Sequence, residues 1–275
     1  MNTDLTFSGV VPDIDRRFGA LTRLYGTIGA ARIRSAHVVV VGLGGVGSWA
    51  AEAAARSGVA QLTLIDMDHL AESNVNRQVH ALTPTIGQAK VLAMRDRIAL
   101  IHPECVVNCI EEFVDVGNWN NLSARFSEKC LASQPLAVLD ACDNVSAKTA
   151  MAAWSFNHSS IEFIGVGAAG GKRLAHLVDI VDLADVSHDP LLTRLRSNLR
   201  KFHKAPSAGK KMGIPYVFSK EAVRNPDLLL GTEMTSSSSL HSLSCHGYGS
   251  TVSVTATFGF SAMGWLLDKV ASSSD

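Results

Sequence analysis

The sequence predicts an α/β protein with a doubly wound, Rossmann-like and mostly parallel sheet, followed by a C-terminal extension. Short runs of apolar, β-branched residues alternate with segments of helical periodicity through the first two-thirds of the chain. Strands of a parallel sheet have this continuous apolar character because helices cover both of its faces. A glycine-rich turn also joins the first apolar run to a helix, which is typical of nucleotide-binding folds.

Six apolar runs are expected to be strands, and four periodic segments are expected to be helices. The expected strands are 37–41, 61–65, 105–110, 136–139, 161–166 and 174–181. The expected helices are 47–57, 86–101, 145–156 and 189–203, the last with Pro190 in its first turn. Residues 204–248 are rich in Pro, Gly and Ser, which predicts a long mobile loop. We expect a single domain over residues 1–275.

The charges balance over the whole chain but not along it. Among 275 residues, 25 Lys+Arg face 25 Asp+Glu, which excludes a protein that binds nucleic acid through a uniformly basic surface. Between residues 191 and 224, however, nine basic side chains face Glu221 alone, a local net charge of +8. This distribution predicts a basic strip that binds nucleic acid, and its candidate contacts are Arg194, Arg196, Arg200 and Lys201.

Cysteine spacing and the chain ends suggest a cytoplasmic protein. The five cysteines are irregularly spaced and include no CxxC pair, so neither a disulfide framework nor a thiolate zinc site is expected. The first 15 residues do not resemble a secretory signal. Residues 251–267 carry no charge, which favours a buried helix or strand–helix. The alternative for this segment is peripheral or C-terminal membrane association.

The strongest local motif is GLGGVG at residues 42–47, directly after the first expected strand. In this motif Gly42 permits a tight turn, Gly44 and Gly45 let the backbone approach a phosphate, and Gly47 permits close helix–strand packing. Asp66 ends the second expected strand 19 residues after Gly47, a spacing that suits a carboxylate binding ribose hydroxyls. These features predict a nucleotide site without distinguishing NAD, FAD and ATP.

Three further motifs favour a triphosphate. NVNRQ at 74–78 and GQAK at 87–90 supply Arg77 and Lys90, and DACDN at 140–144 supplies Asp143 after the fourth strand. Arginine and lysine neutralise phosphate charge, and a carboxylate holds Mg²⁺, whereas hydride transfer needs neither. Each residue also has an ordinary explanation, such as a solvated helix lysine or an N-cap aspartate. Their combination in chain order favours ATP with Mg²⁺.

In this order, GLGGVG, LIDMD, NVNRQ, GQAK and DACDN resemble the ubiquitin-activating-enzyme-like adenylyltransferases, which activate a carboxylate as an acyl-adenylate. The resemblance covers about residues 16–170. It implies that Asp66 binds ribose, that Asn74, Arg77 and Lys90 contact phosphates, and that Asp143 binds Mg²⁺. The segment RRFGALTRLYG resembles the family's N-terminal arginine motif. This implies a homodimer in which Arg23, or otherwise Arg17, reaches the nucleotide of the partner.

Other stretches resemble the members of this family that act on tRNA carrying threonylcarbamoyladenosine. They are RLYG, NRQVHAL, GAAGG, SHDPL, YVFSKE and TVSVTATFGF, and they extend the resemblance over nearly the whole chain. The implied reaction is ATP-dependent cyclisation of the modified nucleoside through an acyl-adenylate, with net loss of water. Because the attacking group belongs to the same nucleoside, ring closure benefits from high effective molarity.

Several alternatives remain open from the sequence. An adenylyltransferase for a small ubiquitin-like sulfur carrier would use the same nucleotide residues, but such members usually carry the zinc cysteines that are missing here. A NAD(P)-dependent oxidoreductase and a non-catalytic nucleotide-binding scaffold are disfavoured by the three motifs. Cys245 is either a catalytic or sulfur-accepting residue, with a sulfur-transfer partner, or merely an accessible thiol. Backbone carbonyls of the glycine-rich loops could also hold a monovalent cation.

Overall fold

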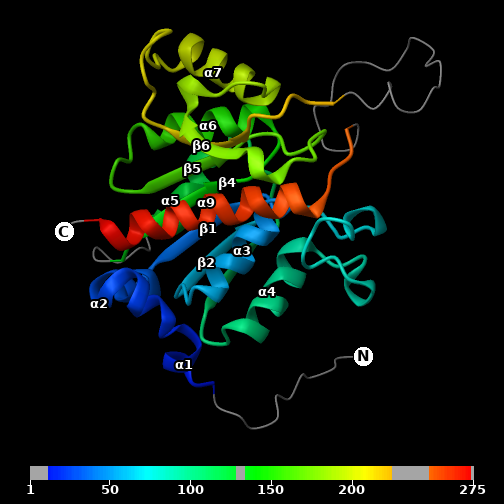
Figure 1. Ribbon diagram of the computed structural model, residues 1–275, viewed down its shortest axis with the longest axis vertical. Coiled ribbons are helices and arrows are strands. Elements are labelled where there is room, and N and C mark those ends of the chain that lie inside the picture. The colour runs from blue at the N-terminus through cyan, green and yellow to red at the C-terminus, as the bar shows by residue number, and fades with distance from the viewer. Residues whose placement is uncertain (1–11, 128–133, 225–247, 274–275) are drawn as a thin grey trace.

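The computed structural model describes residues 12–127, 134–224 and 248–273, which form a three-layer α/β fold (Figure 1). Its seven-stranded sheet has the order β3-β2-β1-β4-β5-β7-β6. The strands are β1 (His37–Val41), β2 (Gln61–Ile65), β3 (Val106–Ile110), β4 (Leu136–Asp140), β5 (Glu162–Val166), β6 (Val178–Asp182) and β7 (Pro215–Ser219). All neighbouring pairs are parallel except β6–β7, which is antiparallel. The predicted doubly wound, mostly parallel fold is therefore confirmed.

Helices cover both faces of the sheet. One face carries α2 (Ala20–Ser35), α3 (Gly47–Arg56), α4 (Lys90–Ile101) and α9 (Val252–Ser272). The other carries α5 (Trp119–Ser127), α6 (Val145–Ser155) and α7 (Pro190–Phe202). A short helix, α1 (Ile14–Phe18), precedes α2, which is interrupted at Gly26 where φ is +72°. Figure 1 shows α9 running across the sheet next to α2 and α3.

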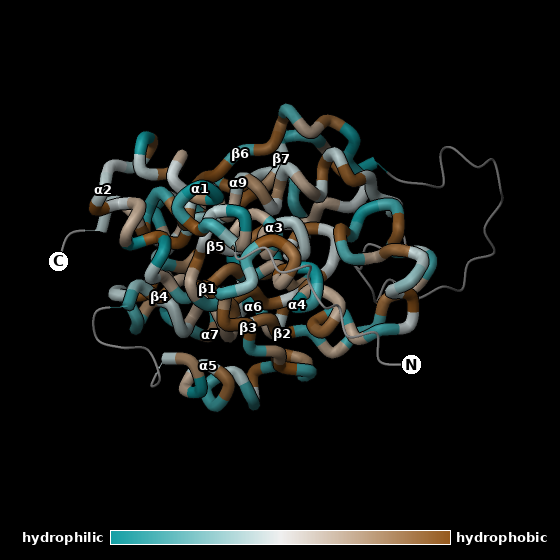
Figure 2. Tube along the Cα trace, turned by 90° about the horizontal axis from the view of Figure 1, so that it is seen from below, coloured by the Kyte–Doolittle hydropathy of each residue, from teal (hydrophilic) through white to brown (hydrophobic). Residues whose placement is uncertain are grey.

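Two apolar clusters fill the spaces between sheet and helices. Alternate residues of β1 contribute to each of them, since Val38 and Val40 face the α3 and α9 side while Val39 and Val41 face α5 and α6. All five residues of β1 are buried, as the unbroken HVVVV run predicts for a central strand. In Figure 2 the hydrophobic colour gathers along the interior strands, and hydrophilic stretches lie at the outside.

Three sequence-based expectations need correction. Residues 215–219 lie within the expected loop 204–248, yet they form β7, which pairs with β5 and β6 in the sheet. The pattern PYVFS is too short to reveal a strand by periodicity, and neighbouring prolines and glycines obscure it. Helix α5 was not expected, and α4 begins at Lys90 rather than at residue 86. Residues 225–247 of the expected loop lie outside the described residues.

The C-terminal apolar segment forms one long helix, α9, and not a strand followed by a helix. Its residues Val254, Phe258, Ala262 and Leu266 are fully buried against α3, α2 and the sheet, which accounts for the uncharged sequence. Among the described residues, no helix combines the length and the apolar character needed to cross a bilayer.

The strand order determines where a ligand can bind. The chain moves from β1 to β2 and β3 on one side and then crosses to β4 on the other side of β1. Loops that leave β1 and β4 therefore diverge and open a crevice at the carboxyl ends of these strands, where ligands of open α/β sheets bind.

Candidate functional site

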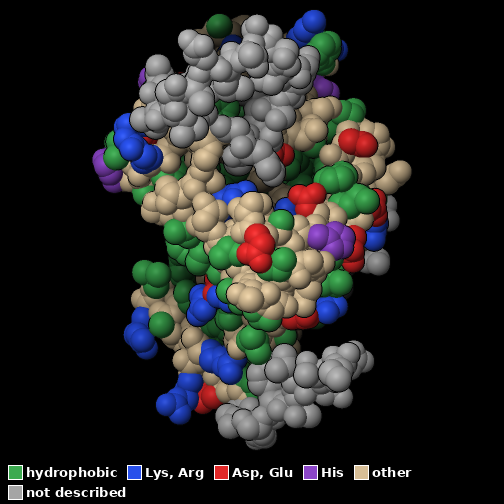
Figure 3. Space-filling view, turned by 90° about the vertical axis from the view of Figure 1, so that its right-hand side faces the viewer, with side chains coloured by type: hydrophobic (Ala, Val, Ile, Leu, Met, Phe, Trp, Pro, Cys, Tyr) green, Lys and Arg blue, Asp and Glu red, His purple; other side chains and the backbone are tan. Residues whose placement is uncertain are grey.

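A crevice of about 540 Å³ lies at this switch point. Loops after β1, β2, β3, β4 and β5 form its walls, together with the start of α7 and Thr255 of α9. Figure 3 shows the molecule from the right-hand side of Figure 1. On this face, basic and acidic side chains lie close together in a hollow. The crevice is thus lined by residues of all five sequence motifs, namely GLGGVG, LIDMD, NVNRQ, GQAK and DACDN.

The glycine-rich loop after β1 forms one wall through Gly42, Gly44 and Gly45. Gly42 has a φ of +86°, which a side chain would disfavour, and its N–H donates to the carbonyl of Ile65 at 2.8 Å. No side chain caps the N-terminus of α3, which begins at Gly47. Backbone N–H groups at an uncapped helix start are available to an anion, and the helix dipole favours negative charge there.

Gly47 and Gly44 should respond in opposite ways to substitution by alanine. A Cβ on Gly47 would lie 1.8 Å from the carbonyl oxygen of Gly42, whereas a Cβ on Gly44 would meet nothing within 4 Å. We expect Gly47→Ala to lower the unfolding free energy by about 3 kcal/mol or more, since backbone would have to move. Gly44→Ala should melt as the wild type does but bind ATP more weakly, because its methyl group occupies the crevice. Thermal unfolding and nucleotide titration of both variants check this, and a stable Gly47→Ala protein would contradict it.

Asp66 and Lys90 face each other across the crevice floor. Asp66 accepts hydrogen bonds from the N–H groups of Leu43, at 2.6 Å, and Asp68, at 2.8 Å, so its carboxylate ties the glycine-rich loop to the end of β2. Lys90 Nζ lies 2.7 Å from Asp68 Oδ2 and 3.8 Å from Asp66 Oδ1. Burial raises the pKa of Asp66, while the Lys90 ammonium and these N–H groups act in the opposite direction. Lys90 is buried and already oriented towards the crevice.

The NVNRQ motif places Arg77 and Gln78 on the crevice, but not Asn74. The Arg77 guanidinium donates to the carbonyl of Ser73 at 2.6 Å and to Asn76 Oδ1 at 3.0 Å. Asn74 is buried behind the wall, where its Oδ1 accepts the N–H of Ala71 at 3.0 Å, so the structure gives it a capping role in place of the expected phosphate contact. Gln78 Oε1 is buried without a partner among the described residues, and the side chain lines the crevice.

The DACDN motif separates two carboxylates with different surroundings. Asp140 is fully buried and forms an ion pair of 2.9 Å with Lys148, which is also fully buried. Asp143, three residues later, is exposed on the crevice wall, and none of the hydrogen bonds within the described residues engages its carboxylate. Asn144 caps α6 by accepting the N–H groups of Ser146 and Ala147. The carboxylate of Asp143 is thus accessible from the crevice.

This arrangement fits Mg²⁺ bound together with a nucleotide. Mg²⁺ usually takes one or two protein carboxylates and completes its shell with phosphate oxygens and water. No group of three or more His, Cys, Asp or Glu side chains that could bind a metal by themselves occurs in the described part of the chain. Asp143 is the candidate protein ligand, and phosphate oxygens and water would complete the shell.

Two residues that line the crevice were not predicted from the sequence. Gln78 belongs to a recognised motif, but its unpartnered amide oxygen is visible only in three dimensions. Phe113 lies in the loop after β3, where its side chain is 62% exposed beside the crevice. Asp115 and Asn118 stabilise this loop through hydrogen bonds to its backbone. A large exposed aromatic side chain at a nucleotide crevice suits an adenine ring.

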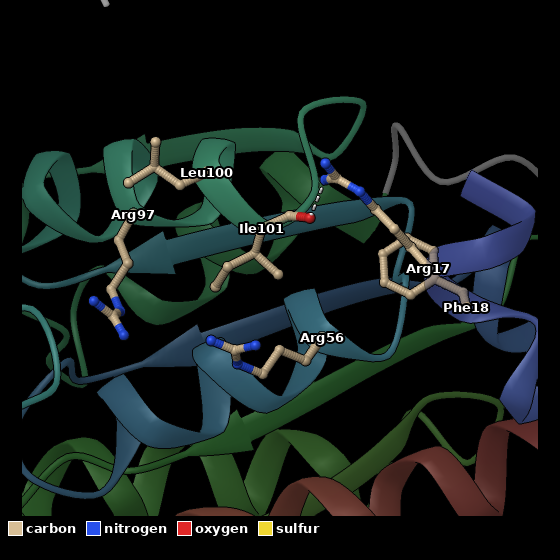
Figure 4. Close-up of a pocket in the computed structure, with 6 residues that line it drawn as sticks. All are labelled: Arg17, Phe18, Arg56, Arg97, Leu100 and Ile101. Carbon is tan, nitrogen blue, oxygen red and sulfur yellow. Dashed lines mark hydrogen bonds between the residues drawn. The ribbon is translucent and has the colours of Figure 1, made fainter. Parts of the chain in front are cut away.

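The two candidate arginines of the N-terminal motif lie away from the crevice of their own chain. Arg17 lines a second cavity, of about 470 Å³, with Phe18, Arg56, Arg97, Leu100 and Ile101 (Figure 4). There it donates to the carbonyl of Ile101 at 2.6 Å and so caps the C-terminus of α4. Arg56 and Arg97 both bind the buried Glu52. None of the nucleotide motifs reaches this cavity.

Arg23 differs from Arg17 because it is exposed on α2. No hydrogen bond or ion pair within the described residues holds its guanidinium. Leu24 and Ile28 on the same helix are also exposed, by 73% and 74%. Arg23 therefore remains the arginine available to another chain.

The basic strip is smaller than its sequence suggests. Arg196 donates to the carbonyls of Leu183, Ala184 and Val186, and Arg200 donates to that of Pro206, so both guanidiniums stabilise neighbouring loops. These two residues were expected to contact RNA; the structure shows both partly buried, and the RNA contact remains a prediction. Lys220 and Arg224 are exposed but form ion pairs with Asp179 and Glu221. The other exposed cations of the strip are Arg194, Lys201, Lys204, Lys210 and Lys211. They are named below as the α7 basic surface.

The described cysteines are not suited to nucleophilic chemistry. Burial raises the pKa of Cys105 to about 12, and burial together with the Asp140 carboxylate raises the pKa of Cys142 well above its ordinary value. Cys142 Sγ also donates to Asp140 Oδ1 at 3.0 Å. Cys245 lies outside the described residues, so its predicted role remains a prediction.

The fold and the crevice define an α/β nucleotide-binding protein with the polar groups of an adenylate-forming site. The chain belongs to the ThiF family, whose pattern matches residues 18–182. It is 38% identical over 268 residues to the tRNA threonylcarbamoyladenosine dehydratase of Haemophilus influenzae, which covers 97% of each chain. A solved structure of the E. coli tRNA N6-threonylcarbamoyladenosine dehydratase, in complex with ATP, matches with a TM-score of 0.79 and 37% identity, covering 95% of this chain and 96% of that one.

Molybdopterin-synthase adenylyltransferases are also similar, but over a shorter part of the chain. The molybdopterin-synthase adenylyltransferase of Salmonella typhimurium is 38% identical over 120 residues, 44% of this chain and 45% of that protein. This match covers less than half of either chain. The similarity to the tRNA threonylcarbamoyladenosine dehydratases covers nearly the whole chain, which favours the tRNA-modifying group.

Proposed function

We propose that the protein catalyses the ATP-dependent cyclisation of N6-threonylcarbamoyladenosine in tRNA through an acyl-adenylate. The observation that carries this conclusion is the convergence of the glycine-rich loop, Asp66, Arg77, Lys90 and Asp143 in one crevice. Similarity to tRNA threonylcarbamoyladenosine dehydratases over nearly the whole chain supports the choice of substrate.

The chain's own residues would act mainly by binding and orientation. Asp66 would bind the ribose hydroxyls, and Phe113 would pack against the adenine ring. The N-terminus of α3, with Arg77 and Lys90, would bind the phosphates and stabilise the charge that develops when a carboxylate oxygen attacks the α-phosphorus. Pyrophosphate leaves in that step. AMP leaves when the carbamoyl group of the same nucleoside attacks the activated carbonyl carbon and closes the ring.

Mg²⁺ bound to Asp143 would supply additional neutralisation of the phosphates and favour departure of pyrophosphate. Asp143 suits this role because it is exposed to the crevice on a turn whose other polar groups already have partners. The reaction class is that of a ligase-type, adenylate-forming enzyme.

Pyrophosphate exchange distinguishes this function from activation of a sulfur-carrier protein. Labelled pyrophosphate should enter ATP only when tRNA with threonylcarbamoyladenosine is present. Unmodified tRNA and a small carrier protein ending in Gly-Gly should both fail to support exchange. Exchange with the carrier and not with tRNA would instead support the adenylyltransferase alternative, in which a sulfur-transfer protein is the partner.

The α7 basic surface is the proposed site for the phosphates of tRNA. Reversing Arg194, Lys201 and Lys211 to Glu should weaken tRNA binding about tenfold or more and reduce its dependence on salt concentration, since fewer cations would be released. ATP binding should not change, because these residues do not line the crevice. Filter binding at several salt concentrations measures both effects.

A matched control reverses exposed cations elsewhere on the surface. Arg95 and Lys269 lie on α4 and α9, and the variant with both changed to Glu should bind tRNA nearly as the wild type does. Equal tRNA affinity in the triple variant, or equal losses in both variants, would contradict a local binding surface on α7.

We also propose a homodimer in which Arg23 completes the crevice of the partner. The exposed Leu24 and Ile28 beside it offer apolar surface for such a contact. Arg23→Ala and Asp143→Asn should each be inactive, but mixing them with subunit exchange should restore activity. One site of each mixed dimer then has an intact crevice and an intact Arg23. If Arg23 acted within its own chain, the mixture would remain inactive.

A further inference from the structure

Lys172, in the loop that follows β5, is buried although it is not part of any recognised nucleotide motif. Its side chain is among the largest that are fully buried. The ammonium Nζ donates to the backbone carbonyls of Ser219, at 3.2 Å, and Glu221, at 3.1 Å. No ion pair within the described residues accompanies these two bonds. Because burial of an unpaired charge is costly, its retention here needs an explanation.

The surroundings of Lys172 are those of a small cation site. Backbone carbonyl oxygens are the groups that replace the hydration shell of K⁺ in proteins. The carboxylates of Asp189 and Glu221 are near enough to favour the charged form of Lys172, while burial lowers its pKa. Both carboxylates are occupied by other donors, Asp189 by the N–H groups of Ala168 and Leu192. The ammonium of Lys172 therefore occupies the position that a monovalent ion would take between the carbonyl oxygens of Ser219 and Glu221.

The bonds of Lys172 connect the ends of two neighbouring parallel strands. Ser219 ends β7, and Glu221 follows it, while Lys172 lies after β5. Glu221 strengthens the connection because its Oε2 accepts the N–H groups of Arg173 and Leu174, both at 2.8 Å. Burial opposes ionisation of Glu221, but these bonds and Arg224 outweigh it and lower its pKa.

The same loop forms part of the crevice wall. Gly167, Ala168 and Ala169, which precede Lys172, line the crevice opposite the glycine-rich loop. Adjacent to Lys172, the N–H of Gly171 donates to the carbonyl of Gly249, and the N–H of Arg224 donates to that of Gly171. Displacement of Lys172 would therefore loosen a wall of the nucleotide site.

We propose that Lys172 is a positioning residue whose ammonium serves as a tethered monovalent cation, holding the carbonyls of Ser219 and Glu221 and thereby the crevice wall at residues 167–169. At this loop, the ammonium would take the role of the monovalent cation that backbone carbonyls of the glycine-rich loops could otherwise hold. Only the expected effect on turnover rests on the proposed function, because the structural effect is measurable without tRNA or ATP.

The test compares two substitutions that differ in the space they leave. Lys172→Ala opens a cavity beside the carbonyls, and Lys172→Met fills it with an uncharged chain. Melting temperatures are measured in KCl, NH₄Cl and choline chloride at equal ionic strength. In choline chloride both variants should melt about 5 °C or more below the wild type, since buried carbonyls lose a charged donor. KCl or NH₄Cl should recover part of this loss for Lys172→Ala only.

Turnover and two further variants complete the test. Lys172→Ala should show lower kcat or higher KM for ATP, with recovery in KCl, while the wild type should be insensitive to the choice of cation. Lys172→Arg keeps the charge and should remain insensitive as well. If Lys172→Ala does not fold, Lys172→Ser also leaves the space beside the carbonyls open and should show the same cation response. Melting of Lys172→Ala or Lys172→Ser that does not depend on the cation would overturn the proposal.

Discussion

Lys90→Met is expected to reduce adenylate formation by about 100-fold or more, because it removes a buried cation that faces both the phosphates and two carboxylates. Lys90 Nζ lies 2.7 Å from Asp68 and 3.8 Å from Asp66. Without it, the negative charges of Asp66 and Asp68 would repel the triphosphate. Pyrophosphate release measured under single-turnover conditions reports this step directly.

The pH dependence of the Lys90 variant gives an independent check. Burial already raises the pKa of Asp66, and the Lys90 ammonium opposes that rise. In Lys90→Met the pKa of Asp66 should therefore be still higher, so its carboxylate would be lost at a higher pH as the solution is acidified. The acid limb of the profile for ATP binding should shift upwards. Arg95→Gln, on the same helix but outside the crevice, should change neither rate nor profile.

Asp143→Asn is expected to have the second large effect, a loss of about 100-fold or more in Mg²⁺-dependent adenylation. The substitution keeps size and shape but removes the charge that binds the metal ion. Asp143 is exposed and unengaged within the described residues, so the melting temperature should not change. Nucleotide binding measured without Mg²⁺ should be affected much less than binding with Mg²⁺.

Asp140→Asn provides the contrast, because Asp140 lies in the same motif but is buried. It pairs with Lys148, and removal of one partner leaves a buried charge uncompensated. Such changes cost about 3–5 kcal/mol, so Asp140→Asn should lower the melting temperature strongly. Near-normal adenylation by Asp143→Asn, or equal destabilisation by both substitutions, would remove Asp143 from its proposed role.

The sequence was most informative where local chemistry and chain order agree. The run HVVVV followed by GLGGVG predicts both β1 and the phosphate loop, because a buried strand and a tight glycine turn each have a local signature. Asp66 and Asp143 could be placed in one crevice because the carboxyl ends of parallel strands share an edge, and Lys90 because it begins the next long helix after β2. All three line that crevice in the structure.

The features that the sequence could not predict depend on which partners each side chain finds in the folded chain. Asn74 and Arg77 are close in the same motif, yet one caps a turn and the other faces the crevice. Arg196 and Arg200 carry the same charge as Arg194, but Arg196 donates to carbonyls of the loop before α7 and Arg200 to the carbonyl of Pro206 in the loop after it. Lys172 gave no signal at all, since only pairing of β5 with β7 brings the carbonyls of Ser219 and Glu221 to it.

The most direct test of the central proposal is the mass of the product nucleoside. The protein is incubated with ATP, Mg²⁺ and tRNA that carries threonylcarbamoyladenosine, and the tRNA is then digested and weighed by mass spectrometry. We predict that the modified nucleoside loses the mass of one water molecule, and that this loss requires ATP and is absent with Lys90→Met. An unchanged nucleoside mass after incubation with wild-type protein that binds both ATP and tRNA would contradict the proposed function.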